Sequence, residues 1–315
     1  MPTADLRLEN IERAARLIDP VFRNSPQFVD EQLCRALGHR VMVKVETANP
    51  IRSFKGRGSD FLIHDLDPRQ KVVCASAGNF GQAIAYSART RGMAAEVFVA
   101  ADANPLKLDR IRSFGAGVTV GGADFDAAKR QARAYADQHS GCVFVEDGED
   151  PAITEGAGTI AVELLQSGPF DAILVPLGDG ALVTGIALWM KHHSPQTKIL
   201  GVCASGSPAM LHSWRAGKSL PSVTMNTIAD GIAVRIPISK AVERMQGLVD
   251  DIVLVDDAQM LEAMRLAAGT LGIILEPSGA AGLAAIRAHA PAGDRLATVL
   301  TGGNIHPSLL PGLFK

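Results

Sequence analysis

The sequence lacks the features that mark a membrane protein, a secreted protein or a nucleic-acid-binding protein. Its longest apolar runs, such as 94–101, are strand-sized and fall far short of the ~20 residues that span a bilayer. The N-terminal region contains no apolar stretch of the kind found in secretory signals. A formal net charge of −2 offers no excess of positive charge for nucleic acid or an anionic membrane. We therefore expect a cytoplasmic protein that has neither nucleic acid nor a membrane as a partner.

Cysteine is scarce, and low-complexity linkers and internal repeats are missing. The four cysteines lie far apart and form no CxxC or metal-spaced pair, so we expect reduced thiols and no metal site. Without a linker to divide the chain, a second domain is expected as an insertion and not as an appended tail. The cysteines are Cys34, Cys74, Cys142 and Cys203.

Hydrophobic residues are abundant, at 47%, and they alternate between strand-like and helix-like patterns. Near-continuous apolar strands separated by helices predict an α/β protein with parallel sheets covered on both faces. We expect a large domain of residues 1–70 and 149–315 with a small domain of residues 71–148 inserted in it. Strands are predicted at 41–45, 71–75, 95–100, 118–120, 142–145, 171–176, 198–203, 251–255 and 296–300. Helices are predicted at 6–18, 80–91, 105–114, 124–139, 155–166, 181–193, 258–271 and 278–289.

One lysine, Lys55, lies between a predicted strand and a helix that we expect to begin at Ser53. A serine is a good N-cap, and Pro50 favours an extended chain before it. The positive end of the helix dipole disfavours a charged lysine in the first turn. Lys55 is thus a candidate for a neutral amine that acts as a nucleophile. An ordinary surface lysine at a helix start explains this stretch equally well when it is taken alone.

Two strand-to-helix loops have the composition of anion-binding sites. Residues 76–81 (SAGNFG) expose successive backbone N–H groups at a helix start, which suits a carboxylate, and an ordinary capped turn is the alternative. Residues 178–182 (GDGAL) resemble a phosphate cradle, although neither a Walker A motif nor a dinucleotide-binding motif is present. Ligands of parallel sheets lie at such loops, so both segments are candidate site segments.

Two further segments follow the same logic. Residues 301–304 (TGGN) place the hydroxyl of Thr301 at a strand end, where it suits a neutral hydrogen bond to a flat ligand. Residues 276–280 (EPSGA) read as a helix entry that begins at Glu276, and Pro277 at the first helical position explains much of this pattern structurally.

Taken together, these motifs and their order resemble the fold type II pyridoxal-phosphate enzymes, and among them the serine/threonine dehydratase group. The resemblance extends over about residues 40–305. It rests on the segments SFKGRG (53–58), SAGN (76–79), GAGTIA (156–161), the loop at Gly178, TIADGIA (227–233), EPSG (276–279) and TGGN (301–304).

The resemblance implies pyridoxal 5′-phosphate as cofactor and assigns residues to it. Lys55 matches the lysine that binds the cofactor aldehyde and later serves as base and acid. Phe54 would pack on the ring, Asn79 would meet the ring hydroxyl, and Thr301 would face the pyridine nitrogen. The other implied cofactor residues are Gly231 beside the ring, Glu276, and the phosphate loop of Gly178, Asp179, Gly180, Ala181 and Leu182.

The resemblance also implies the substrate and the reaction. Backbone amides of Ser76, Ala77, Gly78, Asn79 and Phe80 would bind the carboxylate of a small amino-acid substrate. Thr301 carries no negative charge to keep the pyridine nitrogen protonated, so a long-lived carbanion is disfavoured and rapid loss of a β-substituent is favoured. We expect α,β-elimination of water from an L-threonine- or L-serine-type substrate, with Lys55 and Ser76 as catalytic residues. A homodimer is implied by the resemblance alone.

Departures from the family pattern narrow these expectations. Ala77 replaces the second serine of members that racemise serine, so efficient racemisation is not expected. The segment 205–211 offers no carboxylate for the divalent metal of some relatives. Asp179 and Ala181 depart from the usual four glycines of the phosphate loop. Phe80 stands where the family commonly has a smaller residue or a histidine. The sequence ends at Lys315 without room for a regulatory domain, which favours a catabolic or specialised enzyme.

Three alternatives remain open at this point. The enzyme can be a dehydratase for 3-hydroxyaspartate, which Arg52 or Arg57 in the cleft would favour, or for a phenylserine. It can be a β-replacement synthase. It can also be a non-catalytic protein that binds a phosphate-containing ligand.

Overall fold

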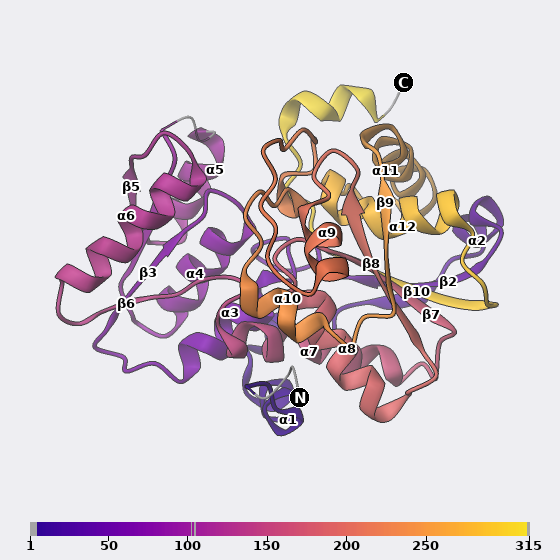
Figure 1. Ribbon diagram of the computed structural model, residues 1–315, viewed down its shortest axis with the longest axis horizontal. Coiled ribbons are helices and arrows are strands. Elements are labelled where there is room, and N and C mark those ends of the chain that lie inside the picture. The colour runs from indigo at the N-terminus through magenta and orange to yellow at the C-terminus, as the bar shows by residue number, and fades with distance from the viewer. Residues whose placement is uncertain (1–4, 102, 104, 314–315) are drawn as a thin grey trace.

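The computed structural model describes residues 5–101, 103 and 105–313. It contains two sheets that lie side by side, and the larger has six strands in the order β1-β2-β10-β7-β8-β9 (Figure 1). All neighbours in this sheet are parallel except β1, which pairs antiparallel with β2. The strands are β1 (Gln27–Val29), β2 (Arg40–Val45), β7 (Ala172–Pro176), β8 (Lys198–Ala204), β9 (Asp251–Val255) and β10 (Arg295–Leu300).

The smaller sheet is built from a continuous part of the chain and is fully parallel. Its strand order is β5-β4-β3-β6, and its central strands are apolar along most of their length because both faces are covered. The strands are β3 (Lys71–Ala75), β4 (Ala95–Val99), β5 (Gly117–Val120) and β6 (Cys142–Phe144).

Helices cover both faces of the large sheet, and successive residues of β7 show the two cores. Ile173 and Val175 pack with α1 (Leu8–Leu17), α7 (Pro151–Leu165) and α8 (Ala181–His193), whereas Leu174 packs with the helices of the opposite face. This alternation is the period of two of a strand covered on both sides. The opposite face carries α2 (Glu31–Leu37), α11 (Asp257–Leu271) and α12 (Pro277–His289), and Figure 1 shows the sheet between these layers.

The small sheet is covered in the same way. Its two cores separate α6 (Phe125–Gln138) from α4 (Asn79–Thr90) and α5 (Pro105–Ser113). Helix α3 (Lys55–His64) packs against both α4 and α7, so it lies between the small sheet and the large one. The remaining elements are α9 (Ala209–Ala216), α10 (Ser239–Met245) and the 3₁₀ helices η1 (Pro20–Phe22), η2 (Asp230–Ile232) and η3 (Pro307–Gly312).

The predicted α/β class with parallel sheets is confirmed, and the domain boundaries at 70/71 and 148/149 stay a prediction. Strand β1 and helices α2, α9 and α10 were not predicted, and neither were the three short 3₁₀ helices. Helix α7 begins at Pro151, four residues before the predicted start, because Pro151 occupies the first helical position after Asp150. Within the described residues, every helix is too short or too polar to cross a bilayer.

Candidate active site

Every residue that the sequence predicted for the site lines one cavity of about 600 Å³ between the two sheets. The cavity lies where β3, β7 and β10 end, which is the usual position of ligands in parallel sheets. From the small-sheet side come Ser76, Ala77, Gly78, Asn79 and Phe80. Phe54 and Lys55 lie at the start of α3, and Gly178, Asp179, Gly180, Ala181, Leu182, Gly231, Glu276 and Thr301 come from the large-sheet side.

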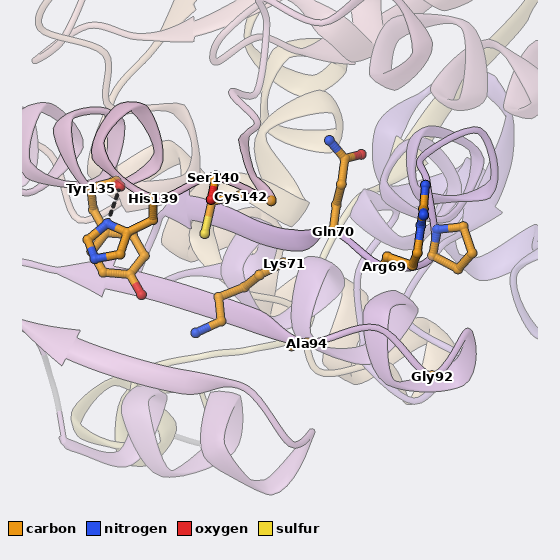
Figure 2. A pocket seen from close by; sticks show the side chains of 11 residues that line it. Arg69, Gln70, Lys71, Gly92, Ala94, Tyr135, His139, Ser140 and Cys142 are labelled. Atoms are coloured by element: carbon orange, nitrogen blue, oxygen red, sulfur yellow. Dashed lines mark hydrogen bonds between the residues drawn. The ribbon is translucent and has the colours of Figure 1, made fainter.

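A second hollow, of about 550 Å³, lies at the opposite, amino-terminal ends of β3 and β6 (Figure 2). Lys71 and Cys142 border it, and His139 beside it donates a hydrogen bond to the carbonyl of Tyr135 at 2.7 Å. None of the predicted site residues lines this hollow. The cavity at the carboxyl ends of the strands is therefore the candidate active site.

Helix α3 begins at Lys55, so the predicted start at Ser53 is wrong. The backbone of Ser53 forms a β-bridge to Gly302, and Phe54 donates its N–H to the carbonyl of Thr301 at 3.1 Å. These bonds hold Ser53 and Phe54 against the end of β10, so the helix can begin only at the next residue. Ser53 Oγ then accepts the N–H of Lys55 at 3.2 Å, so it closes a local turn.

The Lys55 side chain points into the cavity and has two close neighbours. Its Nζ atom lies 4.7 Å from the centre of the Phe54 ring and forms an ion pair with Asp147. Asp147 was not predicted as a site residue. The only signal for it was its position just after β6, in a parallel sheet whose strand ends gather at one edge. The helix dipole is therefore not the only electrostatic influence on Lys55, because a carboxylate lies against the amine.

A chain of side-chain amides crosses the cavity wall. Asn304 donates from Nδ2 to Oδ1 of Asn79 at 2.7 Å, and Asn79 donates from its own Nδ2 to Glu276 at 2.6 Å. Burial raises the pKa of the Glu276 carboxyl to about 7. Asn304 therefore orients the residue that the sequence assigns to the ring hydroxyl, and Glu276 lies next to it.

The loop between β7 and α8 has the geometry of an anion cradle. Gly180 has φ of +94°, and a Cβ atom on Gly178 would lie 2.8 Å from the carbonyl oxygen of Gly231. Glycine is needed at both positions, because one is left-handed and the other leaves no room for a side chain. Asp179 lines the cavity, and burial followed by the charge of Asp147 raises the pKa of Asp179 to about 6.

Two hydroxyl side chains lie together on the large-sheet side. Thr301 donates from Oγ1 to the carbonyl of Ser278 at 3.5 Å. The Oγ atom of Ser278 is buried and has no hydrogen-bond partner within the described part of the chain. Ser278 lines the cavity although the sequence did not single it out. Thr301 and Ser278 thus offer this wall neutral donors and acceptors.

The arginines that would have favoured an acidic substrate are not in the cavity. Arg57 is fully buried and pairs with Glu46 and Glu163 on the other side of α3. Residues two positions apart on a helix face different directions, so Arg57 cannot share the environment of Lys55. Arg52 does not line the cavity either. Neither residue therefore supplies the cleft arginine that would have favoured 3-hydroxyaspartate.

Comparison with known proteins agrees with the chemistry that the cavity residues suggest. A sequence profile described as "Pyridoxal-phosphate dependent enzyme" matches residues 18–302. The chain belongs to this family. Pyridoxal phosphate is accordingly its cofactor.

Individual members of the family are similar over most of the chain. The biosynthetic L-threonine dehydratase of Pasteurella multocida is 35% identical over 87% of this chain and 55% of its own length. The L-threo-3-hydroxyaspartate ammonia-lyase of a Pseudomonas species is 31% identical over 96% of this chain and 98% of its own. The threonine deaminase from T.th. superposes with a TM-score of 0.90 at 31% identity, covering 95% of this chain and 98% of that chain. The chain thus spans about half the length of some curated relatives, 55% for the Pasteurella enzyme.

The residues lining the cavity fit pyridoxal phosphate. Lys55 offers the amine that an aldehyde requires, and the loop from Gly178 to Leu182 offers backbone N–H groups at the start of α8 for a phosphate. The hydroxyl of Ser278, which has no hydrogen-bond partner among the described residues, lies beside Thr301 and suits a ring nitrogen that needs a neutral partner.

Proposed function

We propose that this enzyme removes water from a β-hydroxy amino acid of the L-threonine or L-serine type and releases a 2-oxo acid and ammonia. The observation that carries the proposal is that Lys55 lies in one cavity with the carboxylate-type loop 76–80 and the phosphate-type loop 178–182. The names of the Pasteurella and T.th. relatives, a threonine dehydratase and a threonine deaminase, support this reaction class.

The chain's own residues divide the work of binding. The backbone N–H groups of residues 76–80 hold the substrate carboxylate, and those of residues 178–182 hold the cofactor phosphate. Phe54 packs on the cofactor ring, Asn79 meets the ring hydroxyl, and Gly231 leaves room beside the ring. Thr301 provides a neutral contact to the ring nitrogen.

The proton transfers fall to Lys55 and Ser76. When bound, the cofactor supplies an electron sink for the pair that remains on the α-carbon. Lys55 takes the α-proton, because its amine is the base at this end of the cavity. The Oγ atom of Ser76 accepts the N–H of Gly78 at 3.1 Å, so its own proton is free to pass to the departing hydroxyl. Ala77 carries no acid for the opposite face of the substrate, which disfavours racemisation.

Location and assembly complete the proposal. The four cysteines are free thiols, which fits the reducing cytoplasm. The family resemblance supports a homodimer. We also retain residues 71–148 as an inserted domain, since the strands of the small sheet all lie within that range.

The test replaces Lys55 and follows both cofactor binding and turnover. The Lys55→Ala variant is expected to lose the visible absorbance of the lysine-bound cofactor and the release of 2-oxo acid from a panel of β-hydroxy amino acids. Lys198→Ala is the matched control, because Lys198 is exposed and outside the cavity. Normal turnover by Lys55→Ala would exclude the proposed role. Cofactor binding without any 2-oxo acid release by the wild type would exclude the proposed reaction.

A further inference from the structure

The cavity carries more negative charge than its own cations balance. Arg235 pairs with Asp124 and Asp126 at the start of α6, and Lys107 pairs with Asp230. These pairs leave one carboxylate in excess at the rim, because three aspartates share two cations. Lys129 also lines the cavity but pairs with Glu146 at 2.8 Å. The interior carboxylates Asp147 and Asp179 are left with Lys55 as their cation, and Lys55 is the residue that the cofactor engages.

Asp147 has an oxygen that lacks a donor. Its side chain is nine-tenths buried, and its Oδ2 atom contacts Lys55. Its Oδ1 atom is buried and has no hydrogen-bond partner among the residues that the structure describes. A buried carboxylate oxygen without a partner is costly, so a donor is expected at this position when the site is filled.

Asp179 lies in the loop next to Asp147 and, unlike Asp147, has no ion-pair partner in the described part of the chain. The two loops touch, because a Cβ atom on Gly148 would lie 2.8 Å from the carbonyl oxygen of Asp179. The usual loop of the resembling family has glycine at this position, so the carboxylate is a feature of this chain. A phosphate held by the same loop adds further negative charge, which makes a cation beside it more favourable.

We propose that the site takes amino acids whose β-substituent carries a positively charged nitrogen, with Asp147 and Asp179 as its counter-ions. The inference rests on the proposed elimination chemistry and extends it from a β-hydroxyl to a β-amino leaving group. Lys55 acts on the α-carbon, and the β-carbon is one bond away. Because Asp147 contacts Lys55 and the loop of Asp179 touches the loop of Asp147, a group on the β-carbon comes within reach of both carboxylates. A negatively charged substituent, as in 3-hydroxyaspartate, is repelled by the same pair.

The reaction balances when the nitrogen itself is the leaving group. Lys55 takes the α-proton, the bond between the β-carbon and nitrogen breaks, and its electron pair leaves with the nitrogen as ammonia. The carboxylates keep the nitrogen protonated until the bond breaks, so no further acid is needed. Hydrolysis of the unsaturated product by one water releases the 2-oxo acid and a second ammonia.

The test uses the holoenzyme and three probes that differ in charge at the β-carbon. L-2,3-diaminopropionate and L-serine have the same number of heavy atoms, and L-threo-3-hydroxyaspartate adds an anionic group. Dissociation constants come from the change in cofactor absorbance, and turnover from 2-oxo acid release. We expect the diamino acid to bind at least about 10-fold more tightly than serine, since hydrogen bonds to charged groups contribute roughly that factor.

Variants distinguish an effect of the cavity carboxylates on substrate charge from a general effect on the fold. In the holoenzymes of Asp179→Asn and Asp179→Gly, the preference for the diamino acid, taken as the ratio of the two dissociation constants within each variant, is expected to fall by about 10-fold. Asp137→Asn removes the same charge from the exposed face of α6 and should preserve the preference. Equal or tighter binding of serine by the wild type, or a preference that survives in both Asp179 variants and in Asp147→Asn, overturns the inference. Turnover of serine without any charge preference would leave the proposed function intact, whereas selective binding without turnover of any probe would count against the function alone.

Discussion

Arg57 donates from Nε and Nη2 to the two carboxylate oxygens of Glu46, each at 2.8 Å, and both side chains are fully buried. Glu163 accepts from the other side of the guanidinium at 2.7 Å, and Lys44 pairs with Glu163. The network joins β2, α3 and α7. It anchors α3 two residues after Lys55 and so fixes the helix start that presents the amine to the cavity.

Removal of Arg57 should therefore destabilise the protein strongly. Arg57→Met leaves two buried glutamates with Lys44 as their only cation in the network, and we expect a loss of about 3–5 kcal/mol in the free energy of unfolding. Urea denaturation measures the change. Arg69→Met is the control, because Arg69 forms an exposed pair with Asp67 that water screens, and it should change the free energy of unfolding far less. Equal effects of the two substitutions would contradict the structural role of the network.

Helices α7 and α8 should be sensitive to a single methyl group at their contact. A Cβ atom on Gly185 would overlap the carbonyl oxygen of Thr154 and the backbone of Gly158. We expect Gly185→Ala to destabilise the protein by about 1–3 kcal/mol through overpacking. Gly269→Ala is the matched change in α11, where a methyl group meets open space, and it should stabilise by about 0.5–1 kcal/mol. Thermal unfolding of both variants measures the expected loss of stability in Gly185→Ala and the expected gain in Gly269→Ala.

Glu276 should give the apoprotein a measurable pH dependence. Its folded pKa is raised from 4.5 to about 7, so the folded protein holds a proton that the unfolded chain has released across this window. The stability contribution of this group is therefore lost as the pH rises from about 4.5 to 7. Relative to Glu276→Gln, the wild type should lose up to about 3 kcal/mol over that range. Urea titrations at several pH values test this, with the exposed Glu262→Gln as control; a constant difference between wild type and Glu276→Gln would refute it.

Asn304 should matter to cofactor affinity although its side chain is not proposed to touch the cofactor. It holds Asn79 in one orientation through the 2.7 Å hydrogen bond and is itself held by the carbonyl of Ile51 at 2.8 Å. Asn304→Ala should weaken cofactor binding by about 10-fold, the value of one hydrogen bond in a buried site. Titration of the apoprotein with pyridoxal phosphate measures it, and Asn304→Asp tests the donated hydrogen bonds alone, because it removes the donor while keeping the size of the side chain. Unchanged affinity in both variants would show that Asn79 needs no support.

The loops of the site were predictable because each follows an apolar strand of a parallel sheet. The carboxyl ends of such strands gather at one edge, so residues 76–80 and 178–182 were each expected at a ligand site. Asp147 was not predictable in this way. It lies in an acidic stretch that reads as a solvated turn, and its burial comes from the opposite wall of the cavity. Ser53 was misplaced because its backbone pairs with Gly302, nearly 250 residues later in the chain.

Arg57 illustrates the limit of reading residues by their neighbours in sequence. Its closeness to Lys55 in the sequence left a place in the cleft open, but the helix turns it toward Glu46. The buried partners come from the end of β2 and from α7, and only the tertiary packing shows that both carboxylates lie there.

Helix α3 packs against α4 of the small sheet and α7 of the large one, and its first residue is Lys55, the lysine proposed to be reactive. The width of the cavity is thus set by how closely two separate layers approach this shared helix. Substitutions at the contacts of α3, far from any ligand, will resize the space for the β-substituent while every lining side chain stays the same. The range of substrates can therefore be changed by substitutions outside the cavity that alter the distance between its two walls.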